Sequence, residues 1–213
     1  ADIDPLEAGG LFEAVVNGSA SPAGKAAFRA HMLLQMARMS VDDGLVMTVH
    51  AGVLRNHSSR TKRAFGPDTG HDLPVPTDFV QGLRPLLERY GLERDFHLVL
   101  FAVDETVYSR EIAPLAGFYP SVFIGAPWWF LDAPDAMARF RSAVTETAGF
   151  SRSSGFIDDT RAFLSIPARH DTARRADAAF LARFVAEGRI QVRDAERVIA
   201  DSVSTQPRRV FKL

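Results

Sequence analysis

Four short strand-like segments, each followed by a polar loop or a helical pattern, constrain the fold most strongly. They cover residues 45–50, 97–103, 121–126 and 155–158, of which the last is the shortest. A continuous apolar run such as residues 45–50 is typical of a parallel strand that is buried on both faces. Strand, loop and helix in this repeated order predict an α/β fold, either an open doubly wound sheet or part of a (β/α)8 barrel.

Helical patterns separate these segments. Residues 26–39 carry apolar side chains at helical spacing and predict a helix that buries Phe28, Met32, Leu33, Met36 and Met39. Residues 78–90 show the same spacing, with Pro85 as a kink or break and Gly91 as the stop. A helical or irregular segment is expected at residues 110–118, and further helices at residues 135–148, 172–187 and 193–203.

Composition argues against several kinds of partner. The 25 basic and 26 acidic residues give a net charge of −1 without a long run of one sign, so neither a nucleic-acid arm nor a polybasic anchor is expected. No stretch approaches eighteen apolar residues, and the lack of cysteine means that any metal must be bound by His, Asp or Glu. We therefore expect a soluble, cytoplasmic protein that binds neither nucleic acid nor membrane, with a loosely ordered segment over residues 1–25.

Ligands of parallel α/β folds gather beyond the carboxyl ends of the strands, which selects a short set of side chains. His50 and Asp159 could bind one metal ion, but a hydrogen-bonded histidine and a helix-capping aspartate are the alternative interpretations. Arg55 and Arg161 indicate an acidic substrate because a guanidinium binds a carboxylate through two hydrogen bonds, unless each pairs with a nearby carboxylate. The same strand ends carry His57, residues 66–72, Asp104, Glu105, Trp128, Trp129 and Asp158.

Other motifs narrow the chemistry. Trp128 and Trp129 form a doublet in which one indole can line a pocket, with packing of both in the core as the alternative. His31 and His97 lie in apolar segments and are expected to be structural. The sequence contains no P-loop, no G-x-G-x-x-G and no G-x-S-x-G motif, so nucleotide-binding and serine-hydrolase functions have no support.

Six segments together resemble the C-terminal half of uronate (glucuronate) isomerase, a family of the amidohydrolase superfamily. In chain order they read VHAGVLRNHSSR, GPDTGHD, GAPWWF, DDTRAFLS, RHDTARR and PRRVF. The resemblance covers roughly residues 26–213 and implies a distorted (β/α)8 TIM barrel, of which the chain holds strands five to eight. It also implies a metal, usually zinc, and the interconversion of D-glucuronate with D-fructuronate and of D-galacturonate with D-tagaturonate in uronate catabolism.

The family's motifs imply roles for five residues. His50 and Asp159 match metal-binding positions, and Asp159 also matches a catalytic base. Arg55, Trp128 and Arg161 match positions that hold the sugar acid, and His50 and Arg161 belong to the catalytic set as well. Moving a proton between C2 and C1 needs a base, an acid and stabilisation of an enediolate, which a metal and an arginine can supply.

Three departures from the family pattern qualify the resemblance. The family's H-x-H, which provides two metal ligands, and its His-Tyr pair are not found in the chain, and Thr205 and Gln206 replace its N-N pair. We therefore expect association with a missing N-terminal half or a homo-oligomer, unless His57, His71 or a neighbouring chain replaces the ligands. Two alternatives stay open, namely another metal-dependent enzyme of the superfamily that acts on an acidic substrate, and an inactive half-barrel binding module.

Overall fold

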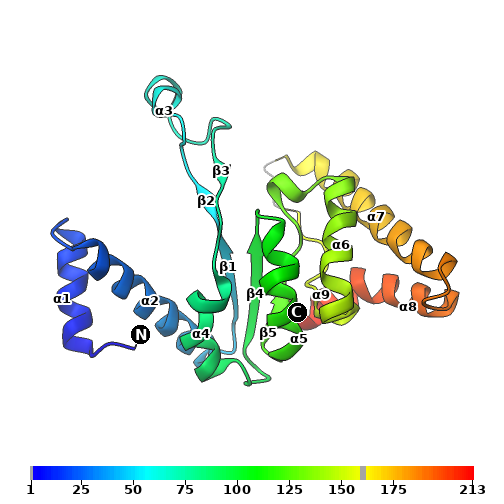
Figure 1. The fold of residues 1–213 in the computed structure, drawn as a ribbon, viewed down its shortest axis with the longest axis horizontal. Helices are drawn as coiled ribbons and strands as arrows, with labels where there is room; N and C mark the ends of the chain where they lie inside the picture. The colour runs from blue at the N-terminus through cyan, green and yellow to red at the C-terminus, as the bar shows by residue number, and fades with distance from the viewer. Residues whose placement is uncertain (1, 159–161) are drawn as a thin grey trace.

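The computed structural model describes residues 2–158 and 162–213 and confirms an α/β fold with a parallel sheet. The sheet has the strand order β1-β4-β5 (Figure 1), with strands Val46–Ala51, His97–Ala102 and Val122–Ile124. Val46 pairs with His97 and Leu98 pairs with Val122, so all three strands end at the same edge. The strand ends that the sequence predicted to carry the functional residues therefore lie together.

Helices occupy most of the remaining chain. The N-terminal part contains α1 Pro5–Val16, α2 Pro22–Asp42, α3 Ser59–Phe65 and α4 Phe79–Tyr90. The middle contains the π-helical turn η1 Tyr108–Ile112, α5 Ala113–Phe118, the 3-10 turn η2 Trp129–Leu131 and α6 Pro134–Ala148. The C-terminal part contains the 3-10 turns η3 Phe150–Arg152 and η4 Phe163–Ser165, then α7 Ile166–Ala186, α8 Val192–Val203 and α9 Thr205–Phe211.

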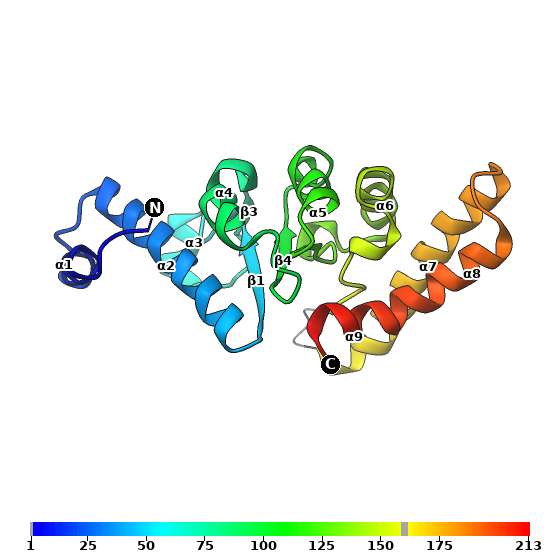
Figure 2. The same cartoon turned by 90° about the horizontal axis from the view of Figure 1, so that it is seen from below.

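One face of the sheet carries the main hydrophobic core. Helices α2, α4, α5 and α6 pack on it, and Figure 2 shows α4, α5 and α6 side by side along the sheet. Alternate residues of β4, Leu98, Leu100 and Ala102, point to this side and are fully buried. Helix α4 contributes Phe79, Leu83, Leu86 and Leu87, as its spacing predicted, and remains continuous through Pro85. Val80, which the same spacing included, is instead 41% exposed.

The opposite face of the sheet is only partly covered. Val99, Phe101 and Phe123 pack against Val210 of α9 in a small second cluster. On this face of β1, Val46 is partly buried against the cluster, whereas Thr48 and His50 are exposed. Burial on both faces, predicted from the apolar run, is therefore right for β4 and wrong for β1, because the described residues place no element over that part of the sheet.

The fourth predicted strand is not formed in the described residues of segment 155–158. The segment just before it pairs with β5 through one isolated bridge between Ile124 and Ser153. There the Ser154 N–H donates to the Ile124 carbonyl at 2.7 Å. The next residue, Gly155, has a φ of +78°, which an extended strand does not accommodate. The chain therefore leaves the sheet at Gly155.

The N-terminal region differs from the sequence prediction in two ways. Residues 1–25 were expected to be loosely ordered, but Pro5–Val16 forms α1, which starts at Pro5 with Asp4 as its N-cap. Helix α2 buries His31, Leu34 and Ala37, whereas three of the predicted core residues are exposed. Met32, Met36 and Met39 are 40%, 50% and 54% exposed. Helix α2 carries apolar residues on more than one side, so spacing alone does not show which side is buried.

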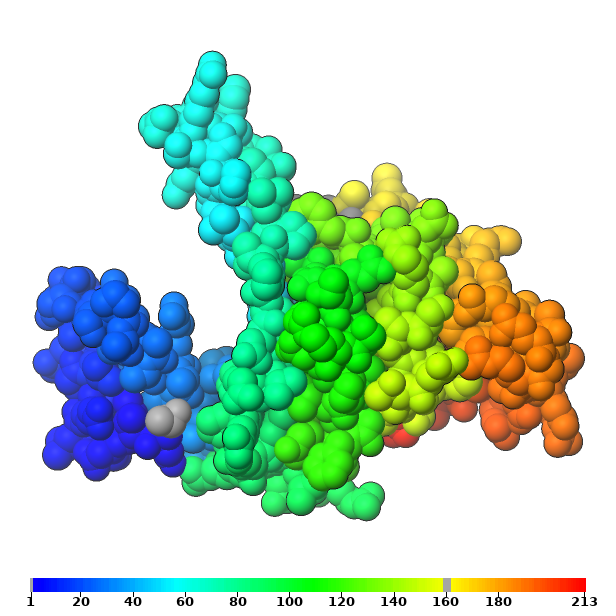
Figure 3. All heavy atoms as spheres, viewed as in Figure 1, coloured from blue at the N-terminus to red at the C-terminus, as the bar shows by residue number. Residues whose placement is uncertain are grey.

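The long loop after β1 forms an arm that projects from the body of the molecule (Figures 1 and 3). Its stem is the antiparallel pair β2 Val53–Leu54 and β3 Leu73–Pro74, and α3 lies at its tip. Among the described residues, no helix is both long and apolar enough to span a membrane.

Candidate active site

Three rings meet where β1, β4 and β5 end. His50 and Phe101 pair across β1 and β4, so their side chains point to the same face. Their rings stack at 4.2 Å between centroids with an interplanar angle of 7°. Trp128, which follows β5, meets the His50 ring edge-on at 5.0 Å. The structure thus brings together two residues predicted for the site, His50 and Trp128.

The tryptophan doublet lines this cluster rather than the core. Trp128 is partly buried and Trp129 is 39% exposed, with 5.6 Å between their ring centroids. The Nε1–H group of Trp128 is buried and has no acceptor among the described residues. A buried donor without a partner is uncommon in native structures, so Trp128 offers a hydrogen bond to a ligand at this position.

Arg55 directly follows β2 in the arm and is bound by carboxylates of its own chain. Its guanidinium donates to Asp72 at 2.9 Å, lies 3.5 Å from Asp68, and sits 5.0 Å above the ring of Trp129. The backbone N–H of Asn56 donates to Asp72 at 2.6 Å, and this bond, with the charge of Arg55, holds the pKa of Asp72 below its usual value despite partial desolvation. Pairing with nearby carboxylates, the alternative that the sequence left open for Arg55, is therefore present.

Strained backbone marks the same region. Non-glycine residues with positive φ occur at Asn56, Asp68 and Trp129, with values of 56°, 59° and 55°. All three residues lie next to Arg55 in sequence or in space. Such conformations cost energy and often accompany functional sites, so the cluster supports a ligand site at this edge.

Asp158 is turned into the protein and is held by Arg169 of α7. Its side chain is 3% exposed, and its Oδ1 accepts a hydrogen bond from Arg169 Nε at 2.6 Å. The other oxygen, Oδ2, is buried and has no hydrogen-bond partner among the described residues. Arg169 also forms an ion pair with Asp132. The predicted residues Asp159 and Arg161 lie outside the described residues.

The described residues do not form a metal site by themselves. No group of three or more His, Asp or Glu side chains suitable for a metal ion is found in residues 2–158 and 162–213. His50 is the predicted ligand that the structure describes, and it lies among aromatic rings. His71, a suggested replacement ligand, instead accepts a hydrogen bond at Nδ1 from the Ser58 N–H, at 3.3 Å within the arm.

The family model for glucuronate isomerase matches residues 1–211. The chain belongs to the glucuronate isomerase family. It is 57% identical over 196 residues to a uronate isomerase of Corynebacterium efficiens and 53% identical over 213 residues to one of Xanthomonas campestris. These matches cover 92% and 100% of the chain but 42% and 45% of the relatives, so the chain spans less than half their length.

Solved structures of glucuronate isomerase relatives agree with the fold. The crystal structure of glucuronate isomerase from Caulobacter crescentus has a TM-score of 0.96 and 52% sequence identity, covering 100% of this chain and 44% of that one. Uronate isomerase from Thermotoga maritima gives a TM-score of 0.92 at 25% identity, covering 98% of this chain and 46% of that one. The structural match thus extends over the whole length of this chain.

Several other polar residues of the chain have structural roles. Asp104 closes a turn by accepting from the backbone N–H of Thr106 at 2.9 Å. Glu105 binds Arg139 through two hydrogen bonds of 2.6 and 3.2 Å. His31 and His97 make backbone hydrogen bonds, to Ile3 and Val210, as expected for structural histidines. Gln206 is buried and donates to the carbonyls of Phe150 and Ser153, whereas Thr205 is exposed.

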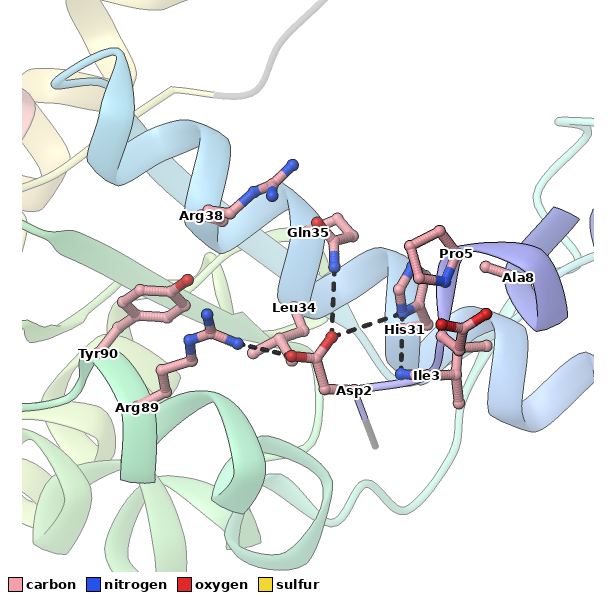
Figure 4. Close-up of a pocket in the computed structure, with 11 residues that line it drawn as sticks. Asp2, Ile3, Pro5, Ala8, His31, Leu34, Gln35, Arg38, Arg89 and Tyr90 are labelled. Carbon is pink, nitrogen blue, oxygen red and sulfur yellow. Dashed lines mark hydrogen bonds and ion pairs between the residues drawn. The ribbon is translucent and has the colours of Figure 1, made fainter.

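A separate hollow of about 670 Å³ lies away from these strand ends (Figure 4). It is bordered by the segment before α1, by α2 and by the end of α4, which leads into the start of β4. Asp2 pairs with Arg89 at 2.7 Å and lies 3.9 Å from His31 across this hollow. The hollow is therefore near the opposite edge of the sheet from the predicted site, and Asp2 within it contacts both Arg89 and His31.

Sequence reasoning missed Phe101, Asp132 and Arg169 as parts of the site, and it included Asp72 only as part of the segment 66–72. Phe101 could have been found from strand register, since it lies one residue before the end of β4, directly opposite His50. Asp72 and Arg169 stand in the GPDTGHD and RHDTARR segments, but their partners depend on how the arm and α7 fold back.

Proposed function

We propose that this chain forms part of a uronate isomerase that interconverts D-glucuronate with D-fructuronate and D-galacturonate with D-tagaturonate. The supporting observation is the cluster of His50, Trp128 and Arg55 at the carboxyl ends of the parallel strands, in a chain that matches the glucuronate isomerase family over residues 1–211. Uronate catabolism in the cytoplasm is part of the same proposal.

The reaction converts an aldehyde at C1 and a hydroxyl at C2 into a hydroxyl at C1 and a ketone at C2. One proton moves from C2 to C1 and another moves from O2 to O1, so a base and an acid are required. We assign the base to Asp159 and the binding of the substrate carboxylate to Arg161 and Arg55. The Nε1–H of Trp128, which has no acceptor among the described residues, supplies a donor to the sugar, and His50 completes the catalytic set.

A divalent metal, zinc in our proposal, would be held by His50 and Asp159 and by ligands from the part of the relatives that this chain does not span. When bound, it would polarise the oxygens on C1 and C2 and stabilise negative charge there. Two protein ligands are fewer than a zinc site normally uses, which is why this proposal requires further ligands.

The architecture that fits these residues is strands five to eight of a distorted (β/α)8 TIM barrel within residues 26–213. The exposed face of β1 and the incompletely covered second face of the sheet support this proposal, because barrel closure would bury both. The missing N-terminal half would then complete the sheet and the active site together.

The test is an isomerase assay with D-glucuronate and D-galacturonate, with and without zinc, following the ketose acid formed. We expect no turnover by the 213-residue chain alone and turnover after it is joined to the N-terminal portion of the Caulobacter crescentus enzyme. Asp159→Asn should abolish this turnover, whereas Asp104→Asn, at the end of β4, should retain most of it. Inactivity of the joined enzyme, or wild-type kcat in Asp159→Asn, would contradict the proposal.

A further inference from the structure

Arg169, in the first turn of α7, connects two buried carboxylates from different parts of the chain. Its Nε donates to Asp158 at 2.6 Å, and its terminal nitrogen forms an ion pair with Asp132. The side chains of Asp158 and Asp132 are 3% and 8% exposed, while Arg169 itself is 34% exposed. The guanidinium therefore lies between the two acids and closes them off from solvent.

This arrangement demands an arginine rather than a positive charge alone. Two buried carboxylates are stable only when their charges are compensated and their oxygens accept hydrogen bonds. The planar guanidinium presents N–H groups in several directions and can reach both acids, whereas a lysine ammonium is a point charge on a flexible stem. Among the described residues Oδ2 of Asp158 has no hydrogen-bond partner, so this buried carboxylate depends on the bond that Arg169 donates to Oδ1.

The two carboxylates belong to the two segments that form the predicted pocket. Asp132 ends the 3-10 turn Trp129–Leu131, so it fixes the loop that carries both tryptophans. Asp158 directly precedes Asp159. A second contact joins α7 to the segment before Asp159: the ring of His170 meets the ring of Phe156 edge-on, with 4.9 Å between the centroids. The first turn of α7 thus holds residues 156–158 at two points.

We propose that Arg169 is a positioning residue that sets the tryptophan loop and the segment before Asp159 in a fixed relation to each other. This inference rests on the proposed isomerase function for its effect on turnover, since that function makes Asp159 and Trp128 part of one site. Arg169 does not touch the substrate; it acts through Asp132 and Asp158.

Tryptophan fluorescence tests the proposal on the chain as it stands. The chain has two tryptophans, Trp128 and Trp129, so its emission reports on the loop that Asp132 anchors. We expect Arg169→Met to shift the emission maximum and Arg169→Lys to shift it less. The matched control is Arg175→Met, which removes an arginine of the same helix whose pair with Asp171 is exposed, and it should leave the emission unchanged.

Kinetics of the enzyme completed with the Caulobacter crescentus N-terminal portion provide the second readout. Because small displacements of reacting groups can cost about 100-fold in rate, we expect Arg169→Met to lower kcat by about 10- to 100-fold with a smaller change in KM. Arg169→Lys should recover only part of this loss, whereas a role limited to charge neutralisation would allow full recovery.

The possible failures are distinguishable. If Arg169→Met, folded by circular dichroism, has the emission and kcat of Arg175→Met, the positioning role is wrong. An emission shift with unchanged kcat in an active enzyme also contradicts it. If the unsubstituted completed enzyme is inactive, the proposed function fails, and the fluorescence result alone then decides whether Arg169 fixes the loop.

Discussion

Gly155 and Gly149 have nearly the same backbone conformation but different surroundings. Their φ values are +78° and +77°. A Cβ atom at Gly155 would lie 2.6 Å from Cγ of Pro207 and 2.8 Å from the Ser202 carbonyl oxygen, whereas nothing lies within 4 Å of one at Gly149. Gly155 therefore fixes how closely the segment leading to Asp158 passes α8 and α9.

Alanine substitutions separate these two effects. Gly149→Ala should lower the free energy of unfolding by about 1–3 kcal/mol through backbone strain alone, because its φ of 77° and ψ of 173° lie in a region that only glycine adopts readily. Gly155→Ala should lose a further 1–3 kcal/mol, roughly, because α9 must shift to relieve the overlap. Urea unfolding of both variants measures the difference. Equal decreases in the free energy of unfolding would mean that Pro207 can move away from the added methyl group without cost.

At the residue scale, the sequence predicted where the site residues lie better than it predicted which side chains they bind. The rule that ligands gather at strand ends placed His50 and Trp128 in one site, because that rule depends only on the direction of the strands. It did not predict that Arg55 binds Asp72, which depends on the turn at Asn56 and the fold of the arm. Nor did it predict that Arg169 joins Asp132 to Asp158, residues 26 positions apart in the chain.

At the element scale, α9 attaches the C-terminal end of the chain to the first residues of β1 and β4. The Val210 carbonyl accepts a hydrogen bond from His97 Nδ1 at 2.8 Å, and Lys212 donates to the carbonyls of Gly44 and Asp95 at 2.8 and 2.6 Å. These residues precede or begin β1 and β4. Helix α9 was not predicted, because it has only seven residues and its hydrogen bonds to the starts of β1 and β4 come from segments distant in sequence.

His97 should make the attachment of α9 sensitive to pH. Burial lowers the pKa of His97 below its usual 6.5; the hydrogen bond to Val210 opposes this, and the charges of Lys212, Arg209 and Arg152 lower it further. Since the folded pKa lies below the unfolded one, stability is fully present above about pH 6.5 and is lost as the pH falls toward the folded value.

The variant His97→Asn tests this dependence, because its amide can donate to the same carbonyl without titrating. Denaturant unfolding across a series of pH values should show a fall in stability below about pH 6.5 for the original chain and a smaller fall for the variant. Parallel curves for the two proteins would show that His97 does not contribute to the pH dependence.

At the scale of the whole molecule, the sequence predicted the class of fold but not which surfaces stay open. Apolar runs identified β1, β4 and β5 because continuous apolar segments are a local signal. They also predicted that β1 is buried on both faces, and that prediction is wrong. Burial of the second face requires elements distant in sequence or another chain, which a local apolar run does not reveal. The exposed face of β1 and the exposed methionines of α2 are the result.

These open surfaces lead us to expect self-association of the isolated 213-residue chain. Met32, Met36 and Met39 form an exposed stripe on α2, and contiguous apolar patches promote association more than single exposed side chains do. Sedimentation velocity should show assemblies that grow with concentration. Met36→Glu should weaken them, whereas Val192→Glu, which replaces an exposed apolar side chain on α8, should not. A monodisperse monomer would contradict the half-barrel proposal, because that arrangement leaves a strand edge and an apolar face without cover.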